Sequence, residues 1–189
     1  MYKYGEEISY DFELLMAEDY ESLQFFECKN ERLDNHIRHC VIQNDCIVDE
    51  DGLYFKFVDK NSGKIIGLVS LASSGIIYKV GQYTHVLPAI KIDVLAVDKN
   101  YQKLHYDFTS ENDTNPDNHY YFSDEIIGMI ISHCREMSEK YALVDYIVLY
   151  ADKNAYRYYE RNGFSDYTEF MVKENNQEIH KNIPMYLKL

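Results

Sequence analysis

The sequence predicts an α/β fold, in which helices flank a mixed and twisted central sheet. One observation is an amphipathic helix, whose apolar residues recur at helical spacing: Ile126, Ile127, Ile130, Ile131, Cys134 and Met137. The other is that apolar strands precede and follow it, "AIKIDVLAV" (89–97) and "VDYIVLYA" (144–151). Because strand, helix and strand alternate here, we expect these two strands to be parallel neighbours.

The first half of the chain predicts strands around one helix. Ile8, Tyr10, Phe12 and Leu14 alternate with polar residues, which indicates a strand over 8–14. Asn30 is typical of a helix N-cap, and the apolar residues of the helix that follows lie on one face: Leu33, Ile37, Cys40 and Val41. Residues 52–73 predict a β-hairpin that turns at 59–63, and residues 74–89 predict a loop or a short extra hairpin.

The second half begins with a polar stretch over 98–122, which we interpret as an inserted acidic loop. Ser123 is expected to cap the amphipathic helix. A short helix should then cover 153–162, and Gly163 is placed to end it. Strands over 164–172 and 183–189 should close the sheet, with a polar loop between them.

Composition narrows the function classes. The length of 189 residues suits a single domain over 1–189. A net charge of −13 repels phosphate backbones, so nucleic acid is an unexpected partner and a cationic substrate is favoured. No apolar run reaches membrane-spanning length and the first residues do not resemble a signal peptide, so we expect a cytoplasmic protein. The four cysteines form no metal-binding pair, and we expect no metal site.

The stretch "NAYRYYERNGF" (154–164) resembles the pattern A-x-x-(aromatic)-Y-x-x-x-G-F of the GNAT N-acetyltransferases. The matching residues are Ala155, Tyr158, Tyr159, Gly163 and Phe164. The apolar "VLAV" (94–97) followed by "DKNYQ" is similar to the central strand and acetyl-CoA loop of that family. The resemblance covers about 25–189 and implies a GNAT-like sheet and an enzyme that transfers an acetyl group from acetyl-CoA to a primary amine.

The same resemblance implies roles for individual residues. Backbone groups at Leu95, Ala96 and Val97 would meet the thioester and the pantetheine arm. Further donor contacts are expected at Gln102, Lys103, Ser123 and Asn154. Tyr159 would protonate the leaving thiolate, although a core tyrosine with a satisfied hydroxyl is the alternative in a chain with 19 tyrosines.

The general base stays open. Some relatives have a Glu on the central strand where this chain has Lys91. Asp93 lies two residues further on and points to the same face, so it could act as the base or hold a cationic substrate. His85 is another candidate. Each of them has a structural role as its alternative.

The segment "FFECKNERLDNHI" (25–37) resembles an F-x-C-x-x-x-x-L-D segment of acetyltransferases from toxin–antitoxin pairs. Phe26, Cys28, Leu33 and Asp34 match it. The resemblance implies an antitoxin partner, whereas the alternative is an ordinary amphipathic first helix. Those toxins act on aminoacyl-tRNA, a substrate to which a chain of charge −13 is poorly suited.

The acetyl-CoA loop departs from the family pattern (Q/R)-x-x-G-x-(G/A). Gln102 matches, but His105 and Asp107 replace the glycines whose backbone N–H groups approach phosphate, and Asp152 stands where the family often has Asn. The stretch from His105 through Asp124 contains five acidic residues, so we expect a weakened phosphate site. The helix start near Ser123 could receive the phosphate instead. The oxygen-bearing side chains of "DTNPDN" (113–118) are spaced as in a calcium-binding loop, and the alternative for this stretch is a solvated loop. A GNAT-fold binding or regulatory module that has lost acetyl-CoA is the alternative function.

Overall fold

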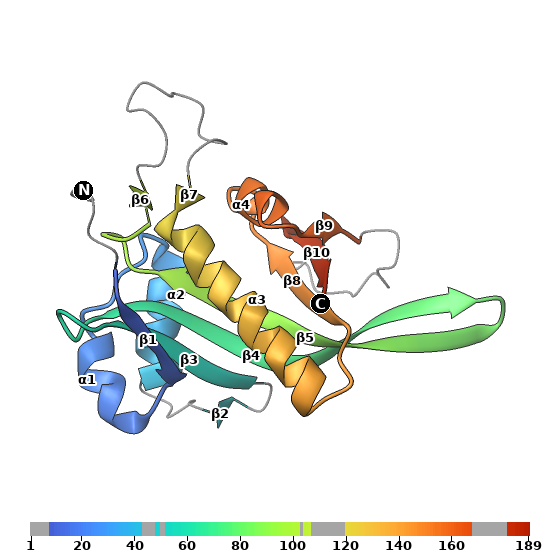
Figure 1. The fold of residues 1–189 in the computed structure, drawn as a ribbon, viewed down its shortest axis with the longest axis horizontal. Helices are drawn as coiled ribbons and strands as arrows, with labels where there is room; N and C mark the ends of the chain where they lie inside the picture. Colours follow the sequence, from blue (N-terminus) through green and yellow to red (C-terminus); the bar gives the residue numbers. More distant parts are fainter. Residues whose placement is uncertain (1–7, 43–47, 50–51, 103, 107–119, 168–180) are drawn as a thin grey trace, which may run out of the picture. The chain divides into compact units, whose positions relative to one another are not determined.

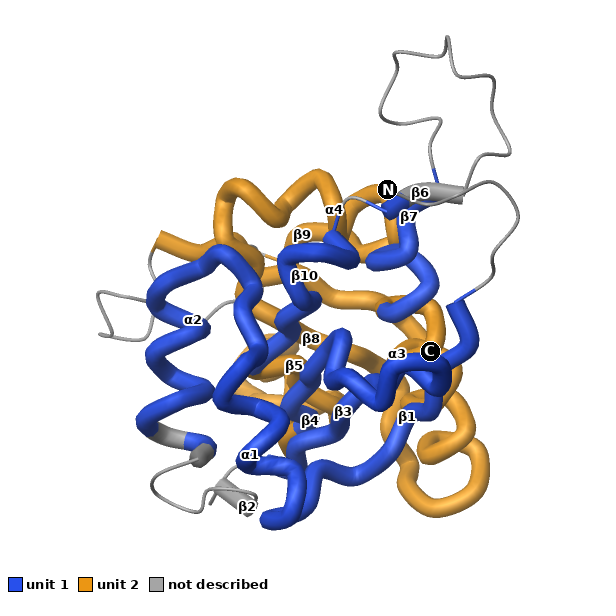
Figure 2. The backbone as a smooth tube through the Cα atoms, turned by 90° about the vertical axis from the view of Figure 1, so that its left-hand side faces the viewer, with its two compact units in different colours: residues 1–71, 94–126 blue, residues 72–93, 127–189 orange. Residues whose placement is uncertain are grey.

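The structure is a computed structural model that describes residues 8–42, 48–49, 52–102, 104–106, 120–167 and 181–189 (Figure 1). The chain forms two compact units, which Figure 2 colours separately. The first unit comprises residues 1–71 and 94–126, and the second comprises 72–93 and 127–189. Strands β4 and β5 and helix α3 run from one unit into the other, so the expected single domain over 1–189 stays a prediction.

The first unit holds the N-terminal elements and the loop after the central strand. Its elements are β1 (Tyr10–Leu14), η1 (Ala17–Asp19), α1 (Tyr20–Leu23), α2 (Glu31–His36), η2 (Ile37–Ile42), β2 (Val48–Asp49), β3 (Gly52–Asp59), β6 (His105–Tyr106) and β7 (Tyr120–Tyr121). It also contains the beginning of β4 (Ile65–Val80), the end of β5 (Tyr83–Val97) and the beginning of α3 (Phe122–Lys140). The strands are hydrogen-bonded in the order β1-β3-β4-β5, with β1 and β3 antiparallel.

Period-two alternation in these strands gives the first unit two cores. On one face, Leu23 of α1 and Ile37 at the end of α2 pack in a buried cluster with Tyr54, Leu68 and Val94 of the sheet. On the other face, the rings of Tyr10 and Phe57 pack edge to face, and Tyr10 packs in the same way against Phe122. The backbone of β5 at Leu95 and Val97 is therefore held in place by the burial of the adjacent side chains of Val94 and Ala96.

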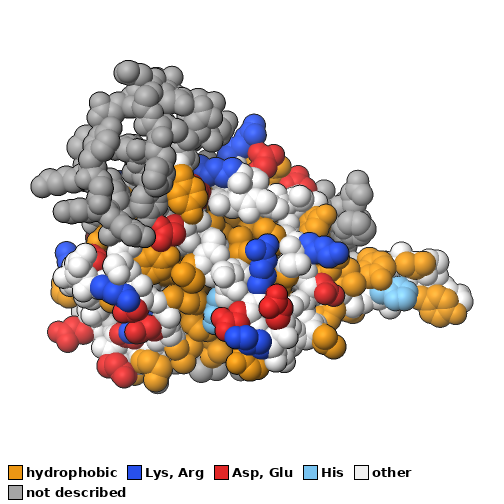
Figure 3. All heavy atoms as spheres, in the orientation of Figure 1, with side chains coloured by type: hydrophobic (Ala, Val, Ile, Leu, Met, Phe, Trp, Pro, Cys, Tyr) orange, Lys and Arg blue, Asp and Glu red, His pale blue; other side chains and the backbone are white. Residues whose placement is uncertain are grey.

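In the second unit, β4 and β5 continue as a long hairpin, which Figure 1 shows as a projecting arm. Gly81 turns the chain between them with φ of 62°, a conformation that glycine adopts readily. Apolar side chains dominate the visible surface of the arm in Figure 3. Its exposed apolar residues are Ile77, Val80, Tyr83 and Val86.

The remainder of the second unit closes the sheet in the order β4-β5-β8-β10-β9, where β8 is Tyr146–Ala151, β9 is Ser165–Asp166 and β10 is Ile183–Lys188. The expected parallel pairing is confirmed, because Ala89 to Ile92 of β5 pair in parallel with Tyr146 to Leu149 of β8. Strand β10 is antiparallel to both β8 and β9. Helix α4 (Tyr156–Arg161) follows β8, also as expected.

Several expectations about individual elements need correction. Ser123 is not the N-cap, because α3 begins one residue earlier at Phe122. Of the two alternatives expected for 74–89, a loop or a hairpin, the hairpin is confirmed, whereas α1 was not expected at all. Within 98–122, short strands β6 and β7 pair antiparallel, while residues 103 and 107–119 lie outside the described part. The calcium-like residues 113–118 and the polar loop 173–180 lie there too.

Candidate functional site

The loop after the central strand is organised by the buried side chain of Asp98. One carboxylate oxygen of Asp98 accepts hydrogen bonds from the backbone and side-chain nitrogens of Asn100, both at 2.9 Å. The Asp98 carbonyl accepts from the backbone N–H groups of Tyr101 (2.9 Å) and Gln102 (3.1 Å). These bonds close "DKNYQ" into a tight turn without any glycine.

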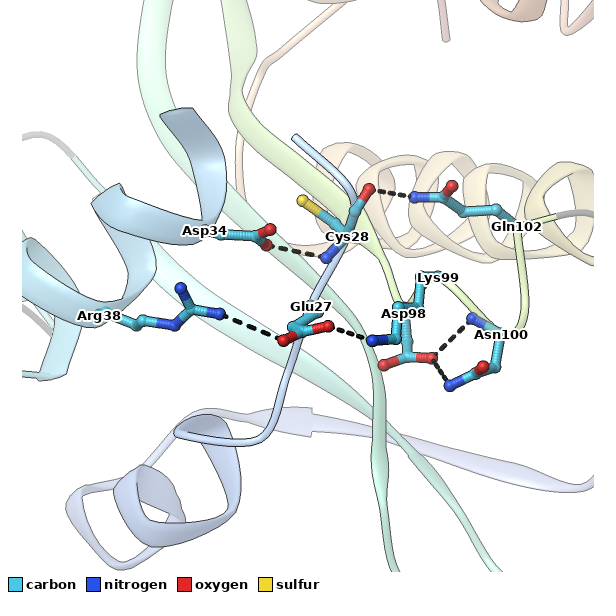
Figure 4. Close-up of polar contacts among 8 residues, drawn as sticks. All are labelled: Glu27, Cys28, Asp34, Arg38, Asp98, Lys99, Asn100 and Gln102. Atoms are coloured by element: carbon cyan, nitrogen blue, oxygen red, sulfur yellow. Dashed lines mark hydrogen bonds and ion pairs between the residues drawn. The ribbon is translucent and has the colours of Figure 1, made fainter. Parts of the chain in front are cut away.

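Gln102 joins this turn to a distant segment (Figure 4). Its side-chain amide donates to the carbonyl of Cys28 at 2.5 Å and to the carbonyl of Val97 at 2.9 Å. The N–H of Cys28 in turn donates to a carboxylate oxygen of Asp34 at 2.8 Å, and Asp34 is only 8% exposed. The amide of Gln102 thus joins segment 25–37 to the end of β5, and the carboxylate of Asp34 holds Cys28 in place within that segment.

Charges around this junction are already paired. Glu27 forms ion pairs with both Lys99 and Arg38, as Figure 4 shows. Asn30 caps α2 as expected, because its side-chain oxygen accepts the N–H of Leu33 at 3.2 Å. Burial raises the pKa of the Cys28 thiol to about 12, so this thiol is a protonated packing residue and not a nucleophile.

The donor-binding residues expected on the first unit fall in different surroundings. Leu95 is half-buried, whereas Ala96 and Val97 are buried at the end of β5. The Val97 carbonyl already accepts the Gln102 amide. Lys103 and Asp107 lie outside the described residues, and His105 belongs to β6, paired with Tyr121. Gln102 therefore shapes the loop from within.

The start of α3 carries acidic side chains in its first turn, Asp124 and Glu125. Asp124 is 5% exposed, and its carboxylate accepts the N–H of Tyr121 at 2.9 Å. Glu125 accepts a hydrogen bond from Tyr10, whose pKa is raised mainly by burial and further by Glu125. Ser123 is the second residue of the helix beside these carboxylates.

On the second unit, Tyr159 is positioned by the end of α4. Gly163 has φ of 90°, and its N–H donates to the carbonyl of Glu160 at 3.1 Å. The N–H of Phe164 donates to the carbonyl of Tyr159 at 3.1 Å, which completes a Schellman ending. The rings of Tyr159 and Phe164 pack edge to face, with their centroids 5.7 Å apart. The matching motif residues thus fix one another.

The phenol of Tyr159 is buried, with 9% of the residue exposed. Burial is the cause that raises its pKa above the ordinary value, and no hydrogen bond to its hydroxyl is recorded within the described ranges. Buried hydroxyls normally have a partner. The catalytic role of Tyr159 therefore stays a prediction.

The candidates for the general base lie on β5. Asp93 forms an ion pair with Lys91 at 2.5 Å, and Lys91 also lies 5.7 Å from the centre of the Tyr150 ring. About a third of each of the two paired side chains is exposed, 30% for Lys91 and 32% for Asp93. His85 is exposed on the arm and stacks on Tyr78 at 5.1 Å, which accounts for its orientation.

Asn154 lies in the turn before α4, where its N–H donates to the side chain of Asp152 at 2.8 Å. Tyr159, Asn154 and Asp93 belong to the second unit, whereas Leu95 to Val97, Gln102 and Ser123 belong to the first. Sequence reasoning missed the roles of Asp98 and Asp34. Asp98 directly follows an apolar strand, a signal for a turn-forming carboxylate, but nothing local identifies the partners of Asp34.

Structural comparison gives matches along nearly the whole chain. A bacterial toxin is similar with a TM-score of 0.69 and 17% identity, over 96% of this chain and 92% of the toxin chain. AtaTR bound with acetyl-CoA is similar with a TM-score of 0.66 and 14% identity, over 95% and 93% of the two chains. The chain has the GNAT fold.

A third similar structure is AtaT complexed with acetyl-methionyl-tRNAfMet, with a TM-score of 0.62 and 14% identity over 94% of each chain. No protein-family model and no curated protein matches the sequence. Among the helices within the described ranges, none is both long and apolar enough to span a membrane. The similarity to these solved structures confirms the α/β fold that was expected from the sequence.

Proposed function

We propose that this protein is an N-acetyltransferase that transfers an acetyl group from acetyl-CoA to a primary amine. The GNAT fold that it shares with AtaTR, a complex bound with acetyl-CoA, supports this proposal. The observation that carries it is the buried phenol of Tyr159, which has no recorded hydrogen-bond partner in the described part of the chain. Tyrosine-to-phenylalanine variants of KacT and AtaT are among the similar structures.

Tyr159 acts on the leaving group in this proposal. A phenol keeps its proton across the neutral range and can donate it to the departing thiolate. Burial raises the pKa of Tyr159, which makes this phenol a weaker acid than an exposed one. The acetyl group passes from sulfur to nitrogen, the C–S bond breaks, and the thiolate takes its proton from the phenol. A positioned acid of this kind contributes typically about 10²- to 10⁴-fold in rate.

The amine and the thioester meet at β5 in this proposal. The parallel register between β5 and β8 ends at Ile92 and Leu149, whereas β5 continues to Val97. The N–H of Leu95 is assigned to the thioester carbonyl, where a donor strengthens as the oxyanion forms. A cationic amine displaces Lys91 from Asp93, and Asp93 then holds the ammonium group or takes its proton.

The acceptor is proposed to be a cationic primary amine on a small molecule or a protein. The net charge of −13 attracts cations and repels a phosphate backbone. Aminoacyl-tRNA is the second candidate, because AtaT is similar in structure and is complexed with acetyl-methionyl-tRNAfMet. An amine attached to tRNA would have to be bound despite the charge of this chain.

A protein partner belongs to the proposal as well. AtaT is similar in structure in its complex with the C-terminus of the antitoxin AtaR. The arm formed by β4 and β5 offers apolar side chains to a partner, with Val80 57% exposed and Val86 60% exposed. Exposed apolar residues that lie together commonly mark contact surfaces.

The test begins with calorimetric titration of acetyl-CoA and continues with thiol release across spermidine, an aminoglycoside, a lysine peptide and aminoacyl-tRNA. We expect binding, release with the cationic amines, and a fall in kcat/KM between about 0.05 and 0.5 M salt because screening weakens steering. Release only with aminoacyl-tRNA would select the second acceptor. Absence of binding and release would favour a GNAT-fold module that binds or regulates without catalysis.

A further inference from the structure

The backbone N–H groups of the loop after β5 are already bonded within the protein. A phosphate cradle needs such groups to point at the ligand. From Asp98 to Gln102 every backbone N–H has an acceptor within the protein. The N–H of Asp98 donates to the carbonyl of Ile66, and that of Lys99 donates to the backbone carbonyl of Glu27. The N–H of Asn100 donates to the Asp98 side chain, and those of Tyr101 and Gln102 donate to the Asp98 carbonyl. Beyond residue 103, the N–H of Leu104 donates to the carbonyl of Tyr101.

Some of the backbone N–H groups where the chain enters α3 are also bonded within the protein. His105 and Tyr106 pair with Tyr121 and Tyr120 in the antiparallel ladder of β6 and β7. The N–H of Tyr121 is bonded to Asp124, and that of Phe122 donates to the carbonyl of Leu104 at 2.8 Å. On the two sides of residues 107–119, the N–H groups of Leu104, Tyr121 and Phe122 thus donate to acceptors within the protein.

Charge at this place opposes a phosphate as well. The carboxylates of Asp124 and Glu125 occupy the first turn of α3, where a helix would otherwise favour an anionic ligand. Asp124 is buried, so its charge is poorly screened by solvent. Lys99 and Arg38 nearby are both paired with Glu27.

A pantetheine thioester has different needs. It carries no charge along its amide arm, and it pairs with strand backbone of the kind that Leu95 to Val97 supply. Binding energy from a remote nucleotide helps a reaction only where the protein contacts that nucleotide. The loop from Asp98 to Gln102 therefore offers no backbone N–H to the phosphates of CoA, while the strand for the arm is kept.

We infer that the protein recognises its acyl donor through the acyl-pantetheine arm and gains little from the nucleotide half of CoA. The donor class is therefore acyl-pantetheine thioesters in general, with acetyl-CoA as one member. This inference rests on the proposed acetyltransferase function and specifies its donor.

The test compares acetyl-CoA with S-acetylpantetheine on the unaltered chain, by calorimetry and by thiol release with a cationic amine. We expect the two values of kcat/KM to agree within about tenfold, and adenosine 3′,5′-bisphosphate at millimolar concentration to leave the melting temperature unchanged. A preference for acetyl-CoA above about 100-fold overturns the inference but leaves the acetyltransferase proposal intact. If neither thioester binds or reacts, the proposed function fails, and the inference fails with it.

Asp124→Asn gives a second readout, because the amide oxygen can still accept the N–H of Tyr121 while the charge is lost. We expect kcat/KM for acetyl-CoA to rise several-fold and that for S-acetylpantetheine to stay unchanged. Glu21→Gln removes an equal charge from an exposed position on α1 and should change neither. An equal change for both donors in Asp124→Asn would contradict the inference. The comparison on the unaltered chain decides the matter even if that variant does not fold.

Discussion

Replacing Tyr159 by Phe should make the protein more stable and at the same time less active. The hydroxyl lies on a residue that is 9% exposed, and it has no recorded hydrogen bond within the described residues. A buried hydroxyl without a partner costs about 1–3 kcal/mol in protein mutational data. Removal of the oxygen leaves the ring contact with Phe164 intact, because that contact involves carbon atoms. We therefore expect the free energy of unfolding to rise by about 1 kcal/mol.

Activity should change in the opposite direction. If the phenol protonates the leaving thiolate, Tyr159→Phe should lower kcat by about 10²-fold or more. The affinity for acetyl-CoA, measured by calorimetry, should change little. Urea unfolding measures the stability of both chains, and thiol release measures kcat.

Tyr156→Phe is the matched control, since it removes a phenol oxygen from the same helix. The hydroxyl of Tyr156 is hydrogen-bonded to two exposed carboxylates, that of Glu160 at a long 3.4 Å and that of Asp166. Both stability and kcat of this variant should stay close to those of the unaltered chain. A Tyr159→Phe protein that is less stable by about 1 kcal/mol and fully active would refute the reasoning, because that result describes a satisfied core hydroxyl.

Three further outcomes are expected. Gln102→Met removes two hydrogen bonds, so it should lower the free energy of unfolding by about 1–2 kcal/mol and raise the KM for the acyl donor. The control Gln82→Met, at an exposed turn, should change neither quantity. Equal changes in the two variants would contradict the role of the Gln102 amide. Gly163→Ala should cost about 1–2 kcal/mol at φ of 90°, whereas Gly128→Ala, whose added Cβ meets nothing within 4 Å, should stabilise α3 in urea unfolding. Burial raises the pKa of the Cys134 thiol from 9.0 to about 12. The thiol therefore loses its proton at lower pH in the unfolded chain than in the native one, so stability should be constant below pH 9 and fall above it. The measurement is the urea midpoint of unfolding from pH 9 to 10. A midpoint that does not fall over this range, and that follows the same profile in Cys134→Ala, would argue against this.

The sequence by itself determined the elements whose signals are local. The helical recurrence from Ile126 to Met137 and the apolar runs on either side predicted α3, β5 and β8, together with the parallel pairing. Asn30 begins a helix and Gly163 ends one where expected, because capping depends on the conformation of a few adjacent residues. The motif around Tyr159 could be found for the same reason, since a Schellman ending joins positions that are close in sequence.

Only the tertiary structure decided what those elements do to one another. Gln102 and Cys28 are 74 positions apart, and no local pattern indicates that the amide of one bonds the carbonyl of the other. The missing glycines predicted a weakened phosphate site, but only the folded backbone identifies an acceptor for each N–H from Asp98 to Gln102. The ion pair of Lys91 with Asp93 and the buried hydroxyl of Tyr159 likewise depend on packing. Local propensity and periodicity specify dihedral angles and buried faces, whereas the partner of a polar atom is set by where the assembled chain places distant residues.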